Sequence, residues 1–385
     1  MSVLESAGTM ALPEGGRVDF NRLRRERRQR LLEAMAATGV DVLMLGRPAN
    51  IAFASGARQL WTSGTRPFSP ACVVVAATGR VHLLSTWDEG VPDEIPHRDL
   101  FGLSWNPAIA SARLRAIEGL DAASRVATDG WGTGAAQLIA SLCPRADVVD
   151  GGGLIRQARA AKSPDEMACL FTAAAAAEAG LSALSAALRP GVTERELVGV
   201  YAERLASIGM ACPPTEGVVW VSTDSSRPRR VPSDRRLQAG DLVALNPGAS
   251  FAGYEVTVGR TRVVGSPSQP GLSQGALATR AALDAVIGTC RPGATGADLL
   301  DAWERYGGTT LYEPLAWGLG LGVEAPVIGP GRLGRSAGIR AGAVLAVQAW
   351  TFTEGVGGIL EQDVIAVGPE GPTVVTRSRS GFPKG

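Results

Sequence analysis

Apolar positions in the first part of the chain follow helical spacing and then form short runs. Residues 22–38 predict a helix, and its apolar positions close to one face are Leu23, Leu31, Leu32 and Met35. Gly39 is suited to end this helix. Apolar runs at 41–45, 71–77, 81–84 and 146–150 predict strands, and segments 112–117, 126–129 and 135–142 continue the alternation of strand and helix. This pattern predicts an α/β domain.

The pattern of the second part begins with two long helices and then changes. Ser163-Pro164-Asp165-Glu166 has the cap, proline and acidic first turn of a helix start, and the helix is predicted to run to about Leu188. Thr193–Glu196 reads as a capping box for the next helix. After Met210 the apolar runs shorten to strand length, at 218–222, 242–246, 254–264, 344–351 and 364–367. With one helix at 273–290, they predict an α+β domain with a curved antiparallel sheet.

Composition supports a folded chain of 385 residues, which is long enough for two or three domains. We predict a flexible tail at 1–16, a first domain at 17–152 and a second at 153–385. Hydrophobic residues make up 45%, and the formal net charge is +1, so neither nucleic acid nor a membrane surface is an expected partner. No signal peptide or membrane-spanning run is predicted, and five scattered cysteines fit a reducing, cytoplasmic location.

Several short phrases along the chain carry a family resemblance when they are taken in order. They are Lys162–Glu166, Pro190–Glu194, Gly240–Val243, Gly253-Tyr254, Arg260-Thr261, Arg291–Ala294, Gly318–Gly322 and Glu324–Pro326. The order resembles the creatinase/aminopeptidase P superfamily over roughly residues 20–380. The resemblance implies an α/β creatinase-type N-terminal domain, which 30–54 also resembles, and an α+β C-terminal domain of the pita-bread fold.

The resemblance also implies a metal site, because metallopeptidases of the family hold two divalent cations with two Asp, one His and two Glu. Carried over by resemblance, these positions fall on Asn246, Thr257, Leu319, Gln348 and Glu361. The family's ligands supply four negative charges to two dications, whereas this set supplies one. Only two histidines, His82 and His97, occur in the chain, and both precede the second domain. We therefore predict no metal, no cofactor and a protein that is not a metallopeptidase.

Two carboxylates are the predicted catalytic groups. Glu255 should point to the same side of its strand as Thr257, which places it near one cavity with Glu361. Two carboxylates in a partly apolar pocket can differ in pKa and divide acid and base work. The alternative interpretations are a structural carboxylate for Glu361 and a solvated charge for Glu255.

The remaining candidates would bind substrate, and they include the neutral residues at the ligand positions, Asn246, Thr257, Gln348 and Leu319. Arg229 stands where the resemblance puts a substrate-binding His, and Arg229 and Arg260 can each bind a carboxylate in bidentate fashion. Trp317 and Trp350 flank ligand positions and are candidates for the pocket wall. Each of these arginines and tryptophans also has a plainer interpretation, as a solvated charge, a strand tie or a core residue.

A second subunit is also expected to contribute to the pocket. Relatives usually form homodimers in which the N-terminal domain of one subunit reaches the pocket of the other. By resemblance alone, Trp61 and Arg66 of the loop 59–66 would make this contribution.

Three functions follow from these residues. The first is a metal-independent enzyme that acts by carboxylate acid/base chemistry on a small polar molecule with an amide, amine or other C–N bond. The second is a catalytically inactive pseudo-peptidase that binds a ligand or partner in the same cleft. The third is an Xaa-Pro aminopeptidase-type metallopeptidase. The sequence does not name the substrate, and it does not separate a hydrolase from a lyase, isomerase or cyclase.

Overall fold

The structure is a computed structural model that describes residues 18–57, 70–102, 104, 106–130, 134–213, 219–223, 231–265, 271–306 and 314–379. It divides into two compact units. One comprises Phe20–Arg159, and the other comprises the chain from Ala160 onward together with the residues before Phe20. The division falls after Arg159, later than the predicted boundary at 152. Leu154 and Ile155 of the intervening helix are buried, and Arg159 donates to Asn50 Oδ1 at 2.6 Å.

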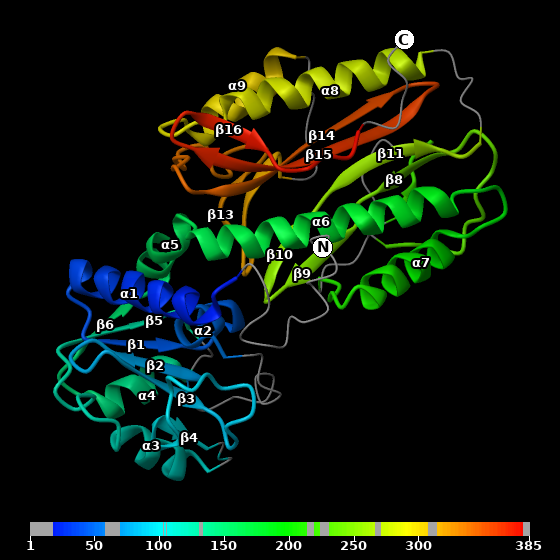
Figure 1. The fold of residues 1–385 in the computed structure, drawn as a ribbon. Helices are drawn as coiled ribbons and strands as arrows, with labels where there is room; N and C mark the ends of the chain where they lie inside the picture. Colours follow the sequence, from blue (N-terminus) through cyan, green and yellow to red (C-terminus); the bar gives the residue numbers. More distant parts are fainter. Residues whose placement is uncertain are drawn as a thin grey trace. The chain divides into compact units, whose positions relative to one another are not determined.

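The N-terminal unit is an α/β domain, as the sequence predicts. Its helices are α1 (Phe20–Thr38), α2 (Pro48–Ser55), α3 (Pro107–Arg115), α4 (Ala135–Leu142) and α5 (Gly152–Ala160). Its strands are β1 (Val42–Leu45), β2 (Cys72–Val75), β3 (Arg80–Leu84), β4 (Leu100–Phe101), β5 (Arg125–Thr128) and β6 (Asp147–Asp150). They form one mixed sheet in the order β4-β3-β2-β1-β5-β6 (Figure 1). The central strands β1 and β2 are fully buried, as expected for apolar runs without polar alternation.

The C-terminal unit contains the long helices and the curved sheet. Its helices are α6 (Pro164–Ala187), α7 (Glu194–Ser207), α8 (Leu272–Thr289) and α9 (Gly296–Arg305). Its first strands are β7 (Val219–Val221), β8 (Leu242–Leu245), β9 (Gly248–Phe251), β10 (Tyr254–Thr257) and β11 (Gly259–Val263). The later strands are β12 (Ala316–Gly320), β13 (Gly322–Ile328), β14 (Val344–Thr353), β15 (Gly357–Gly368) and β16 (Gly371–Val374).

Antiparallel pairing organises this second unit. The main sheet has the order β13-β12-β14-β15-β11-β8-β7, with β16 paired to β15, and β9 and β10 form a separate hairpin. Helices α8 and α9 cover one side of the sheet, whereas α6 packs against the β9–β10 hairpin and α7 packs against α6 and β7 (Figure 1). This arrangement confirms the pita-bread fold that the sequence predicts.

Both predicted helix starts are present as full capping boxes. The Ser163 and Thr193 hydroxyls accept from the backbone N–H groups of Glu166 and Glu196, whose carboxylates accept in return. Helix α6 is also long and apolar enough to cross a membrane, which the search for long apolar runs missed. Half of its apolar window is buried inside the unit, as in the core helix of a folded domain.

Candidate functional site

The two longest strands, β14 and β15, present different side chains to the two faces of the sheet. Odd-numbered positions of both strands belong to the apolar core that they form with α8 and α9, namely Leu345, Val347, Ala349, Ile365 and Val367. Successive residues of a strand point to opposite faces, so even-numbered positions face away from these helices. Gln348 and Gln362 are directly opposite each other in the strand register, and both belong to this second face.

Three neutral polar side chains lie near Gln362, and we call Asn246, Thr257, Gln348 and Gln362 together the amide cluster. Asn246 Nδ2 donates to Gln362 Oε1 at 3.0 Å. Gln362 Nε2 donates to Thr257 Oγ1 at 2.7 Å, and Gln348 Nε2 donates to the Pro314 carbonyl at 2.7 Å. The two glutamines are buried, but Asn246 and Thr257 are half-exposed. Part of the cluster is therefore in contact with solvent.

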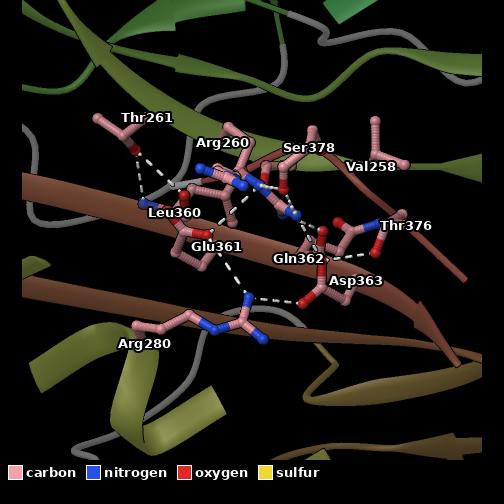
Figure 2. Close-up of polar contacts among 12 residues, drawn as sticks. Val258, Arg260, Thr261, Arg280, Leu360, Glu361, Gln362, Asp363, Thr376 and Ser378 are labelled. Atoms are coloured by element: carbon pink, nitrogen blue, oxygen red, sulfur yellow. Dashed lines mark hydrogen bonds and ion pairs between the residues drawn. The ribbon is translucent and has the colours of Figure 1, made fainter. Parts of the chain in front are cut away.

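The structure corrects the placement of Glu361. The sequence put Glu361 at the last ligand position, but the residue in contact with Asn246 and Thr257 is its neighbour, Gln362. Glu361 points to the opposite face of β15, where it is fully buried 3.5 Å from Arg260 and 3.9 Å from Arg280 of α8 (Figure 2). This placement separates Glu361 from the amide cluster, so it supports the structural interpretation of Glu361 over the predicted catalytic one.

Arg260 is also a structural residue and not a substrate clamp. It is 1% exposed, and its Nη1 donates to the carbonyls of Gly259 and Gln362 at 2.7 Å. Its Nη2 donates to Asp363 Oδ1 at 2.5 Å and to the Ser378 carbonyl at 2.8 Å (Figure 2). Its Nε also donates to the Ser378 carbonyl, at 3.2 Å. Arg260 thus ties β11 and β15 to the C-terminal segment.

Asp363 completes this buried ion network. Arg280 Nη1 donates to its Oδ2 at 2.6 Å, and the Thr376 hydroxyl donates to its Oδ1 at 2.7 Å. Burial acts to raise the pKa of Asp363, but the charges of Arg260 and Arg280 outweigh it and hold that pKa below its ordinary value. The ionised network therefore stabilises the fold at neutral pH.

Glu255 lies on the same side of β10 as Thr257, as the strand alternation predicts. Tyr254 and Val256 are buried on the other side, where Tyr254 Oη donates to Glu166 of α6 at 2.7 Å. Glu255 is half-exposed, and its partial burial raises the pKa of its carboxyl. Of the two carboxylates predicted to be catalytic, only Glu255 is on the same side as a member of the amide cluster.

The predicted wall residues lie in or next to the core. Trp350 is on the same face of β14 as Gln348, is 9% exposed, and packs against Trp220 with ring centroids 5.9 Å apart. Trp317 is half-buried on β12, and Leu319 is buried opposite Val323 in the β12–β13 hairpin. The predicted binding residues Arg229, Trp61 and Arg66 lie outside the described residues.

Fold and site together define a two-domain protein with a creatinase-type domain and a pita-bread domain that contains the neutral amide cluster. Comparison with known families agrees. Residues 27–161 match the creatinase/prolidase N-terminal domain, and residues 168–369, more than half of the chain, match metallopeptidase family M24. The chain belongs to metallopeptidase family M24.

Individual relatives carry peptidase names. The chain is 29% identical over 240 residues to the uncharacterized peptidase YqhT of Bacillus subtilis, covering 60% of this chain and 67% of that one. It is 27% identical over 232 residues to an Xaa-Pro dipeptidase of Pyrococcus horikoshii, covering 58% and 65%. The chain thus matches about two thirds of the length of these relatives.

Solved structures show the same fold along nearly the whole chain. The prolidase of Pyrococcus horikoshii superposes with a TM-score of 0.76 at 20% identity, covering 92% of this chain and 99% of that one. Dipeptidase PepE of Mycobacterium ulcerans superposes with a TM-score of 0.74 at 23% identity, covering 94% and 98%. The prediction that the protein is not a metallopeptidase is contradicted by these family members and by the M24 match.

Members of this family are expected to bind divalent cations. Whether the amide cluster can do so depends on the ligand atoms that its side chains provide. Asn246, Thr257, Gln348 and Gln362 offer amide and hydroxyl oxygens but no negative charge. Among the described residues, no three His, Cys, Asp or Glu side chains are grouped so that they could hold a metal ion. Two dications would keep four uncompensated charges there, so these residues do not fit a dinuclear centre.

Cys212 is an exposed thiol close to the amide cluster, and its reaction with a thiol reagent can be measured. A Cβ added to Gly248 would lie 2.8 Å from Pro213 Cγ and 2.9 Å from Thr257 Cγ2, so the segment 212–213 borders the amide cluster. Cys212 is exposed, and the other four cysteines are buried. Burial raises the pKa of the Cys290 thiol to about 12, which makes that thiol unreactive.

We expect one thiol of the native protein to react rapidly with a chromogenic disulfide reagent, and the other four to react only after unfolding in guanidinium. The measurement is the stoichiometry of the fast phase. Cys212→Ser should abolish this phase, and Cys169→Ser should leave it unchanged. Two or more rapidly reacting thiols in the native chain would contradict the burial of the other four cysteines.

Proposed function

We propose that the pocket of the C-terminal unit binds a small peptide-like molecule through hydrogen bonds to the neutral amide cluster, without divalent cations. The observation that carries the proposal is the chain of hydrogen bonds from Asn246 through Gln362 to Thr257. The amide N–H groups of Asn246 and Gln362 already donate within the protein. The amide oxygens of Asn246 and Gln348 and the Thr257 hydroxyl are therefore the groups that would meet the N–H and C=O of a peptide bond. The Xaa-Pro dipeptidase among the relatives supports the same class of ligand.

The apolar surroundings of the cluster support the proposal. Trp350 and Leu360 lie on the same face of the sheet as the two glutamines, two residues away from Gln348 and Gln362 respectively. Binding sites for small molecules commonly combine such apolar walls with a few fixed polar groups. Together they favour a molecule with an amide group and an apolar part, as in a dipeptide that contains proline.

Hydrolysis of the bound peptide is a second candidate function, which the names of the relatives favour. Of the two carboxylates predicted for acid/base work, only Glu255 lies on the same side of its strand as a member of the amide cluster. An assay of proline release from Ala-Pro, with and without chelator, separates hydrolysis from binding alone.

Titration calorimetry with Ala-Pro in the presence of chelator tests the proposal. We expect the wild-type chain to bind and Asn246→Ala to bind about two- to tenfold more weakly, which corresponds to the loss of one neutral hydrogen bond. Asn21→Ala, in the exposed start of α1, is the matched control and should bind like wild type. Equal affinity of wild type and Asn246→Ala, or no binding in the presence of chelator, would contradict the proposal.

A further inference from the structure

Glu255 is a half-buried residue on the side of β10 that also carries Thr257. Its neighbours Tyr254 and Val256 pack on the opposite side of the strand, so the carboxylate is directed to the side of Thr257. A Cβ added to Gly322, in the turn between β12 and β13, would lie 3.9 Å from Glu255 Oε2. The carboxylate therefore lies next to this turn, on the side of β10 that also carries Thr257 of the amide cluster.

Within the described part of the chain, the carboxylate of Glu255 makes no salt bridge and no hydrogen bond. The contrast with nearby carboxylates is clear, because Glu324 is paired with Lys162 at 2.8 Å and Glu166 accepts from Tyr254 at 2.7 Å. Partial removal of a carboxylate from water is unfavourable unless a partner compensates for it. A cation supplied by a ligand would be such a partner.

We infer that the pocket recognises a cationic amine, with Glu255 as the specificity-determining residue that pairs with it. This inference rests on the proposed function, because the same ligand must also reach the amide cluster. Residues two apart on a strand are separated by roughly 6–7 Å, which is about the length of two extended residues. The expected ligand thus has a free amine about 6–7 Å from an amide or carboxyl group, as in an unblocked dipeptide.

The test compares Ala-Pro with N-acetyl-Ala-Pro by titration calorimetry on the full chain. We expect wild type to bind the free amine about tenfold to a hundredfold more tightly, since hydrogen bonds between charged groups are the strong ones. Glu255→Gln has the same shape without the charge, and it should bind the two peptides with equal affinity. Glu203→Gln, an exposed position on α7, should retain the wild-type preference.

Two results separate this inference from the function on which it rests. In the first, Ala-Pro binds wild type, Asn246→Ala weakens that binding, and Glu255→Gln keeps the preference for the free amine. This result would overturn the assignment of Glu255 but leave the proposed peptide binding by the amide cluster intact. In the second, neither peptide binds wild type. The proposed function then fails, and the inference fails with it.

Discussion

Replacing Arg260 by methionine is expected to destabilise the C-terminal unit by about 3–5 kcal/mol. The substitution removes the cation from a site where Glu361 and Asp363 are fully buried. Burial of a carboxylate whose partner has been removed costs far more than an exposed ion pair contributes. Urea unfolding, followed by circular dichroism, measures the change in the free energy of unfolding.

Arg195→Met is the matched control, because Arg195 forms an exposed ion pair with Asp234 at 3.1 Å. Its expected cost is at most about 1 kcal/mol. Arg260→Met combined with Glu361→Gln and Asp363→Asn should recover part of the lost stability, since neither buried carboxylate then remains as a charge without Arg260. Equal losses in Arg260→Met and Arg195→Met would contradict the role of this network.

The network also determines how the unit responds to acid. The pKa of Asp363 is lower in the folded protein than its unfolded value of about 3.9. Its stabilising contribution is therefore complete above that unfolded value, and it is lost as the pH falls through the folded pKa. Without Arg260 the pKa of Asp363 rises, so Arg260→Met should unfold at a higher pH than wild type in an acid titration.

Returning negative charge to the amide cluster is expected to create affinity for divalent cations. In the variant Asn246→Asp, Thr257→Asp, Gln348→Glu and Gln362→Glu, four carboxylates would meet at one site and repel one another. We expect a lower melting temperature without metal and a recovery on addition of Mn²⁺ or Co²⁺. A cation at a hundred times its Kd stabilises the folded state by about 2.7 kcal/mol.

The wild-type chain is the first control in this experiment, and its melting temperature should not respond to either cation. The variant Asn246→Asp and Thr257→Asp changes only the two half-exposed positions, so it is the milder version if the fourfold variant does not fold. If Mn²⁺ or Co²⁺ raises the melting temperature of wild type as much as that of the variants, the neutral side chains do not prevent metal binding, and the prediction is wrong.

Local signals in the sequence predict the helices well. Ser163-Pro164 and Thr193-Glu194 begin α6 and α7 with the predicted capping boxes, because a cap is formed by residues close together in the chain. The predicted strand at 254–264 is in fact two strands. β10 pairs with β9, whereas β11 pairs with β8 and β15. This change of partner at Val258 depends on tertiary pairing, which a local pattern does not contain.

The candidate site shows where sequence reasoning fails by one residue. Glu361, Gln362 and Asp363 are three consecutive polar residues in β15, a strand that is buried on both faces. Such a strand has no alternation of polar and apolar positions from which its register can be read, and a shift of one residue exchanges the two faces. The partners Arg280 and Asn246, which settle the register, are far away in sequence. Asn246, Thr257 and Gln348 were placed by resemblance, and the structure brings them together with Gln362.

Neutral side chains occupy the positions where the family's fold implies charged metal ligands. The metal content of the purified full-length chain tests this directly, determined by mass spectrometry after dialysis against Mn²⁺, Co²⁺ or Zn²⁺ and removal of free ions. We expect far less than one bound ion per chain, with no difference between wild type and Asn246→Ala. About two ions per chain, lost in Asn246→Ala, would contradict this expectation.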